Sequence, residues 1–163
     1  MLNQTLLPEL KQEAANTRRM LERIPFNDTQ WKPHAKSFAI GPLANHVADL
    51  VNWVAFTLGS EGIDWAEFKY QPENATSSEQ LVAIMDKNLE ASVKALEAAT
   101  DEQLMAPWTM RNGEQVFFTM PRIAVIRTFA LNHMIHHRAQ LSVYLRLLDV
   151  PVPGMYGPTA DES

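Results

Sequence analysis

Two histidines one helical turn apart are the residues of this sequence best suited to chemistry. His133 and His137 lie in the segment NHMIHHRAQ, which spans residues 132–140. At the helical rotation of about 100° per residue, their side chains are only about 40° apart around the axis, so both point the same way. Two imidazoles placed like this can bind the same divalent ion, as HxxxH pairs do in zinc sites. The pair alone is a weak signal and needs a third donor.

His46 offers that donor from another part of the chain. It lies in a mostly apolar stripe with Leu43, Leu50, Trp53 and Thr57, so we expect it to face the protein interior. Facing helices of a bundle build metal sites from inward side chains of this kind. Three neutral nitrogens leave at least one coordination position open, which is typical of catalytic zinc.

An alternative interpretation is that each histidine is a core residue with one hydrogen bond to a carbonyl or carboxylate. Against it, three polar rings in one core without a ligand would cost roughly 1 to 3 kcal/mol for each unsatisfied group. The residues alone leave both interpretations open.

Three further residues are candidates for a catalytic role. Asp49, one turn after His46, can orient that ring or act as a base, or it can be a solvated surface carboxylate. His136 lies about 60° around the helix from His133 and can carry a proton, support the ligands or fill space. Tyr144 faces the same side as His133 and can hydrogen-bond a substrate or bound water, or form the floor of the core.

The neighbours of these candidates suggest structural roles. Val125 and Val143 flank His136, which places it near the edge of the stripe. Arg138 points about 140° away from His133, so we expect it to bind loop carbonyls or a carboxylate and not a substrate. Gln140 faces the same side as the ligands. Like Tyr144, it can hydrogen-bond a substrate or bound water, or form the floor of the core.

Composition excludes several function classes. The 163 residues contain no cysteine, which excludes disulfides, cysteine-ligated metals and a cysteine nucleophile. The net charge of −5 opposes binding to nucleic acids and to anionic membranes. The N-terminus lacks the pattern of a secretory signal, and the most apolar stretch, 51–58, is far shorter than the roughly 18 residues of a membrane span. We therefore expect a cytoplasmic protein.

Four segments with helical periodicity must position the histidines. The first runs over about 6–24, with Leu10, Ala14, Thr17, Leu21 and Ile24 as its apolar face. The second runs over about 41–59 and carries His46. The third begins at the capping box of Ser77 and Gln80 and ends near 98. The fourth starts after Thr119, has Pro121 in its first turn, and continues without a break to Pro151.

Two other segments are not helical in this prediction. Asn112-Gly113 predicts a short β-hairpin or a long turn before the fourth helix. The tail from Pro151 to Pro158 must be a loop or an extended segment. Its Met155 and Tyr156 can close over the opening of the site. We also expect aromatic residues of the long connections to cap the bundle or line the site mouth; these are Trp31, Phe38, Trp65, Phe68 and Tyr70.

The predicted fold is all-α: a four-helix bundle in a single domain over residues 1–163. Its connections are long enough that the helix order stays open.

At this point the sequence resembles a known family. His46, the HxxxHRxQ pattern of His133, His137, Arg138 and Gln140, and the tail LLDVPVPGMYGPTADE resemble the DinB/YfiT-like family of metalloenzymes over essentially the full chain. The resemblance implies a four-helix bundle, often homodimeric, in which the three histidines bind a metal such as zinc or nickel. It also implies thiol-dependent transferase or isomerase chemistry with a low-molecular-weight thiol in some members. Ala139 departs from the glycine common in the family's HRGQ, a mild change on a helix.

The expected function follows from both lines of argument. An ion held by His46, His133 and His137 would make a bound water or an incoming thiol easier to deprotonate, and the nucleophile would attack a small electrophile. Two rivals remain: a metal-binding or stress-associated helical protein without turnover, and a homodimeric interaction module whose histidines are incidental.

Overall fold

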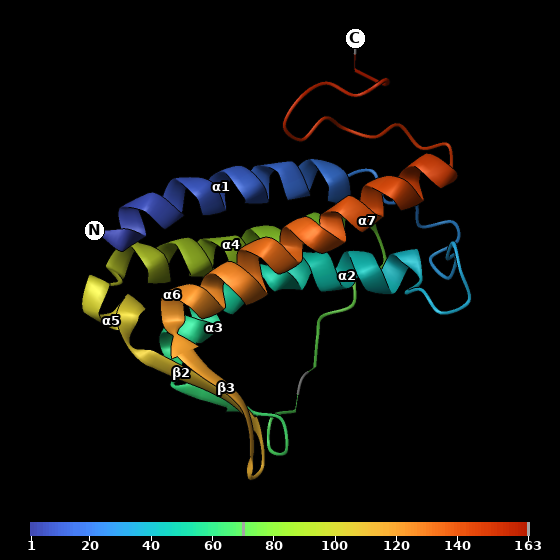
Figure 1. The fold of residues 1–163 in the computed structure, drawn as a ribbon. Coiled ribbons are helices and arrows are strands. Elements are labelled where there is room, and N and C mark those ends of the chain that lie inside the picture. Colours follow the sequence, from blue (N-terminus) through green and yellow to red (C-terminus); the bar gives the residue numbers. More distant parts are fainter. Residues whose placement is uncertain (70, 163) are drawn as a thin grey trace.

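The long helices lie side by side in the computed structural model, which describes residues 1–69 and 71–162 (Figure 1). They are α1 (Leu2–Leu21), α2 (Ile40–Leu50), α4 (Ser78–Ala98) and α7 (His133–Leu147). Helices α1 and α2 each pack against both α4 and α7, and one large hydrophobic cluster fills the space between them. The chain is therefore mostly helical, as predicted.

The first and third predicted helices are confirmed with two changes. The apolar face of α1 is buried, but the helix begins at Leu2 because residues near the end of α4 hold its first turn: the Leu2 amide donates to Asp101 at 2.7 Å and the Asn3 side chain to Leu96 O at 3.3 Å. Ser77 caps α4 by accepting from the Gln80 amide. The side chain of Gln80 accepts from Thr76, however, so the reciprocal bond to Ser77 predicted for a capping box is not the one formed.

The second predicted helix is broken, which the sequence analysis missed. Helix α2 ends at Leu50, and a separate helix, α3 (Trp53–Gly59), follows after a turn at Val51 and Asn52. The buried Ser92 of α4 supports the break: its hydroxyl donates to Val51 O at 2.8 Å and accepts from the Ala55 amide at 3.4 Å. A polar side chain on a neighbouring helix thus replaces hydrogen bonds that a continuous helix would make itself.

A three-stranded sheet adjoins α3 and α6 at one end of the helices (Figure 1). The predicted hairpin is confirmed as β2 (Pro107–Asn112) and β3 (Gln115–Pro121), with Gly113 at φ 59° in its turn. The third strand, β1 (Gly62–Asp64), pairs in parallel with β2 and was not predicted. A Cβ on Gly62 would lie 2.3 Å from Thr109 O, so the close approach of β1 to β2 requires glycine.

The fourth predicted helix starts at Arg122 and is not uniform. Pro121 caps it instead of lying in its first turn, and α6 (Arg122–Val125) leads into a π-helical segment, η1 (Ile126–Asn132), which continues into α7. Because a π-helix has a different period, rotations counted at the α-helical period do not hold across this segment. Val125 is fully buried while Val143 is exposed, so the prediction that both flank His136 on one face was wrong.

The remaining elements complete the chain. A short helix, α5 (Asp101–Met105), connects α4 to the sheet, and the tail after α7 contains no helix, as predicted. None of the helices in the described residues is long and apolar enough to cross a membrane. The all-α prediction is thus roughly consistent with the structure: the hairpin was expected, only β1 adds to it, and of the four predicted helices the second and the fourth are divided into shorter ones.

Candidate metal centre

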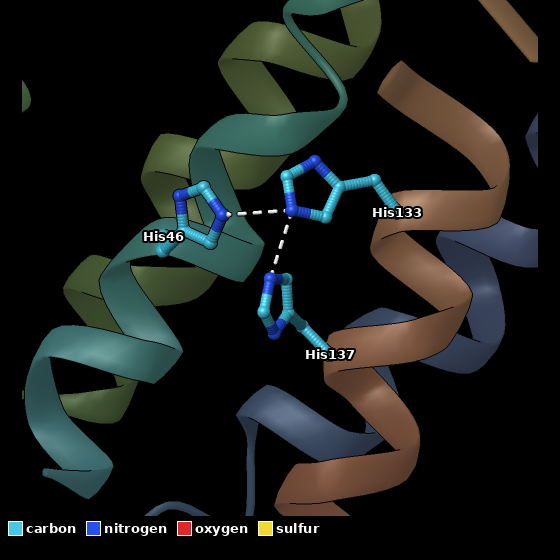
Figure 2. Close-up of side chains that lie close together, drawn as sticks. All are labelled: His46, His133 and His137. Atoms are coloured by element: carbon cyan, nitrogen blue, oxygen red, sulfur yellow. Dashed lines mark hydrogen bonds between the residues drawn. The ribbon is translucent and has the colours of Figure 1, made fainter. Parts of the chain in front are cut away.

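Helices α2 and α7 bring three imidazole rings together (Figure 2). The Nε2 atom of His133 lies 3.4 Å from Nε2 of His46 and 2.8 Å from Nε2 of His137. One ring nitrogen from each histidine falls within 4.8 Å of the others. The predicted trio thus converges. In the sequence, His46 is 87 residues from His133 and 91 residues from His137, and these two are one helical turn apart.

Burial of the surrounding side chains fixes the two helices that carry the trio. On α2, Leu43, Val47 and Leu50 are all at most 1% exposed, and this face holds His46 against α7. On α7, Met134 and Leu141 are fully buried and keep the helix in register. The three histidines lie at the edge of this core: His46 and His133 are partly buried, and His137 is 9% exposed.

Hydrogen bonds to the outer nitrogens orient the two rings of α7. The Nδ1 atom of His137 lies 2.7 Å from Oε1 of Gln140. An amide oxygen only accepts, so Nδ1 carries the proton and Nε2 of the neutral ring keeps its lone pair. His133 also bonds to the backbone of Phe129, one turn earlier, and this bond raises its pKa, as a bond donated to a carbonyl does. His137 therefore presents its Nε2 lone pair to His133.

Burial and mutual repulsion keep His46 and His133 neutral. Burial lowers the pKa of His133 to about 4, helped by the charges that His137, His46 and His136 would carry. Burial also lowers the pKa of His46, with His137 as the second cause. Metal ligation requires neutral imidazoles, so the protein holds His46 and His133 in the form that binds metal at neutral pH.

The donor set fits a divalent cation better than it fits hydrogen bonding alone. Nδ1 of His137 donates to Gln140, so Nε2 of this ring has no proton of its own and its lone pair faces Nε2 of His133 at 2.8 Å. A cation placed among the three nitrogens would be coordinated by lone pairs of this kind. Three histidines can hold a metal ion at this point.

The other predicted candidates surround the trio in different ways. Asp49 lines the same small cavity as His46. His136 lies 3.1 Å, through Nε2, from the amide nitrogen of Gln140, so one glutamine joins His136 to His137. The hydroxyl of Tyr144 donates to Phe38 O at 3.1 Å, which ties the segment before α2 to α7.

The sequence placed Gln140 on the ligand side, but it did not assign the orienting of His137 to Gln140 or of His133 to the Phe129 carbonyl. The spacing of Gln140, three residues after His137, was the available signal, since i and i+3 side chains meet on a helix. The spacing between Phe129 and His133 gave no comparable signal because the intervening segment is π-helical.

Arg138 has the predicted structural role. It is 2% exposed, forms an ion pair with the Glu13 carboxylate at 2.6 Å, and donates to Glu13 O and Thr17 Oγ1. Tyr156 joins this network through its hydroxyl, 2.6 Å from Arg138. The prediction that Tyr156 closes over the site was therefore wrong: an ion pair between α1 and α7 holds it on the side of α7 away from the histidines.

The aromatic residues of the connections are divided between two places. Trp65 and Phe68 line the cavity beside His46, as predicted for the site mouth. Trp31 packs edge-on against Tyr144, with ring centroids 5.6 Å apart, and Phe38 is largely exposed. Tyr70 lies outside the described residues.

A second, polar cleft opens on another side of His46. It has a volume of about 500 Å³ and lies between α2, the loop before it and the segment before α4. Asparagine, glutamine and threonine side chains line much of it, among them Asn45, Gln30 and Thr29. The candidate metal centre thus borders this cleft through His46.

Fold and site together define a class: a mostly helical protein with a three-histidine site between two helices. The model of the DinB family matches residues 1–163, and the chain belongs to the DinB family. A DinB-like protein from Bacillus cereus ATCC 10987 has a similar structure, with a TM-score of 0.70 and 23% identity over 92% of this chain and 95% of that one. A DinB-like protein from Bacillus subtilis gives a TM-score of 0.68 and 19% identity over 95% and 96% of the two chains. No curated protein matches the chain.

Proposed function

We propose that this protein is a metal-dependent enzyme in which His46, His133 and His137 hold a divalent ion, zinc or nickel, that activates a thiol or a water molecule. The activated nucleophile attacks a small electrophile, in a transferase or hydrolase reaction. One observation carries the proposal: three Nε2 atoms from two helices converge, and the hydrogen bond of His137 to Gln140 leaves the Nε2 lone pair of that ring free.

The chain's own residues bind and orient. Gln140 and the Phe129 carbonyl hold His137 and His133 in the tautomer that binds metal. Asp49 is proposed as the base that takes the proton of the nucleophile, since it lies on the cavity wall one turn from His46. A bound divalent cation supplies charge that lowers the pKa of a water or thiol at its open position.

The number of donors supports a catalytic site over a purely structural one. Among the histidine, aspartate and glutamate side chains of the described residues, the cluster comprises three donors. Structural zinc sites have four protein ligands, whereas catalytic sites use three and leave one position to water or substrate. Because the sequence has no cysteine, a thiol must come from solution, and the polar cleft beside His46 is wide enough to admit one.

Elemental analysis tests this proposal. Protein purified without a polyhistidine tag is expected to contain close to one equivalent of zinc or nickel, and His133→Ala and His137→Ala are expected to lose it. Arg122→Gln, which removes bonds to carbonyls at the end of α3, provides a control outside the cluster. Equal and negligible metal in all samples would remove the basis of the proposal.

Activity assays then separate the enzyme from its rivals. Metal-loaded protein is mixed with several small thiols and a chromogenic electrophile, and the rate is compared with that of His133→Ala. Rapid, metal-dependent consumption of thiol supports a transferase, and metal-dependent consumption without thiol supports a hydrolase. Bound metal with no turnover in either assay would favour the metal-binding protein without catalysis.

We also propose that the protein is a homodimer in the cytoplasm. The family resemblance supports the dimer, and Val143 and Leu147, one turn apart on α7, each expose more than half of their side chains, at 56% and 58%. Sedimentation velocity of the wild type and of Val143→Asp tests this contact. A monomeric wild type would contradict it.

A further inference from the structure

A small aromatic cavity lies against the candidate metal centre. It has a volume of about 130 Å³ and is enclosed by α2, α3, β1 and the segment that follows β1. Its walls include four aromatic side chains, Trp53, Phe56, Trp65 and Phe68, while His46 and Asp49 of α2 contribute polar groups. A mostly apolar hollow with a few convergent polar groups is the usual form of a small-molecule site.

The four aromatic side chains of the wall form a continuous series of ring contacts. Ring centroids are 5.8 Å apart for Trp65 and Phe68, 5.5 Å for Phe68 and Phe56, and 5.7 Å for Phe56 and Trp53. Trp65 and Phe68 remain 39% and 38% exposed, so two large apolar side chains are kept at the rim. Trp53 also packs on Phe129, whose backbone binds His133, which links the cavity wall to the histidines.

The outer wall is held by a hydrogen-bonded turn and is not a loose loop. The Asp64 carboxylate accepts from the amides of Gly113 at 2.8 Å and Ala66 at 3.0 Å, and it pairs with Arg111 at 2.9 Å. The carbonyl of Asp64 also accepts from the Phe68 amide at 2.8 Å. The sheet therefore positions Trp65 and Phe68. Strand β1, which was not predicted, thus holds the outer wall of the cavity in place.

The size of the cavity limits what it can hold. A hollow of this volume is close to the roughly 150 Å³ of an apolar cavity that binds benzene. It accommodates one six-membered ring or a short alkyl chain, and part of a two-ring group would extend past the rim.

We propose that this cavity binds the single-ring or similarly small apolar group of the substrate and directs the atom next to that group toward His46. The position of the reacting atom near His46 rests on the proposed function. The binding of an apolar group rests on the cavity alone. The substrate class is therefore a small electrophile or thiol that carries one apolar ring.

The first test uses metal-free protein, so that it does not depend on the proposed function. Binding of fluorobenzene is followed by ¹⁹F NMR, with 1-fluoronaphthalene as the oversized probe. Fluorobenzene is expected to bind with a dissociation constant on the order of 1 mM, and 1-fluoronaphthalene more weakly. Trp65→Ala and Phe68→Ala are each expected to weaken fluorobenzene binding about tenfold, by loss of aromatic contacts.

Phe117→Ala is the matched control, since Phe117 is a half-exposed aromatic residue of β3 outside the cavity. It is expected to leave fluorobenzene binding unchanged. Circular dichroism of the two rim variants checks that they fold. Absence of fluorobenzene binding, or equal binding by the rim variants and the wild type, would overturn the proposal.

The second test examines whether a ligand whose ring lies in the cavity also reaches the metal centre. Benzyl mercaptan and ethanethiol are titrated into zinc-loaded protein by calorimetry. The ring is expected to strengthen binding about tenfold in the wild type and in Phe117→Ala, and this advantage is expected to disappear in Trp65→Ala. If fluorobenzene binds but the two thiols have equal affinity, the cavity does not serve the metal centre. If the protein binds no zinc, the proposed function fails, and the first test still decides whether the cavity takes a ring.

Discussion

Each histidine of the candidate centre has two nitrogens, and the partner of one decides what the other can do. Gln140 fixes the proton of His137 on Nδ1, and His133 bonds to the Phe129 backbone. Without these partners, each neutral ring would divide its time between two tautomers, only one of which offers Nε2 to a metal. The site therefore depends on Gln140 nearly as much as on its ligands.

Gln140→Leu is expected to weaken zinc binding by about 10- to 100-fold, because outer hydrogen-bond partners of metal ligands contribute on that scale. Gln140→Glu keeps an acceptor at the same place and is expected to preserve or strengthen binding. Titration against a competing chelator at fixed pH measures both. Equal weakening by the two variants would show that shape, and not the hydrogen bond, is what Gln140 provides.

The low pKa of His133 makes the stability of the metal-free protein depend on pH. The folded-state pKa of about 4 lies below the unfolded value of about 6.5. Between these values the unfolded chain binds more protons, so the free energy of unfolding is expected to fall as the pH is lowered from about 6.5 toward 4. His46 acts in the same direction, since burial lowers its pKa too.

Urea unfolding in the presence of a chelator, at pH 7 and at pH 5, measures this dependence. His133→Gln is expected to lose less stability than the wild type between the two values, because it removes one of the titrating groups. The chemical shifts of the ring protons give the pKa of His133 directly. A His133 that titrates near its ordinary value would contradict the prediction.

At the scale of the elements, periodicity identified most of the helices but not their interruptions. The apolar face of α1, the cap of α4 at Ser77 and the turn at Gly113 follow from local rules, and each is found. The break after Leu50 contains neither glycine nor proline, so local rules did not indicate it. Its support comes from Ser92, 41 residues from Val51, and long-range contacts of this kind are not visible in a local pattern.

The same distinction applies to the site. His133 and His137 were found from their spacing, which falls within the regular helix α7, and His46 from its place in an apolar stripe. The π-helical segment before His133 has no composition that distinguishes it, so side chains before it were assigned to the wrong face, as Val125 illustrates. The contribution of β1 to the cavity wall depends on a parallel strand of three residues, too short for a periodicity signal.

The break between α2 and α3 yields a stability prediction. Ser92→Ala leaves the buried Val51 carbonyl without its hydroxyl donor and is expected to lower the free energy of unfolding by about 1–3 kcal/mol. Ser142→Ala is the control, because it removes a bond of the same kind, to Ala139 O, at an exposed position of α7. It is expected to change the free energy of unfolding by no more than about 0.5 kcal/mol. Urea unfolding of the two variants compares them. Equal effects would show that the hydroxyl of Ser92 does not support the break.

At the scale of the whole molecule, two faces of α7 have separate tasks. One face carries His133 and His137 toward α2, while Arg138 on another face forms a buried ion pair with Glu13 of α1. The tail is fastened to this second face and to its neighbours: Arg19 donates to Gly154 O, and Arg146 pairs with Asp161. Helix α7 thus connects the tail to the fold without placing it over the site.

Burial and the Glu13 carboxylate raise the pKa of the Tyr156 phenol, so the group stays protonated and donates. Its hydroxyl lies 2.8 Å from one Glu13 oxygen and 2.6 Å from Arg138. Because the side chain of Tyr156 is 71% exposed, Tyr156→Phe is expected to lower the free energy of unfolding by no more than about 1 kcal/mol and to speed proteolysis of the tail. Zinc affinity should stay within about twofold of the wild type, because the hydroxyl of Tyr156 bonds to Arg138 and Glu13 and not to a histidine of the cluster. Chelator competition and limited proteolysis on the same samples measure both effects. A variant whose tail is released and whose zinc affinity falls with it would show that the tail reaches the metal centre after all, and would contradict the separation of the two faces of α7.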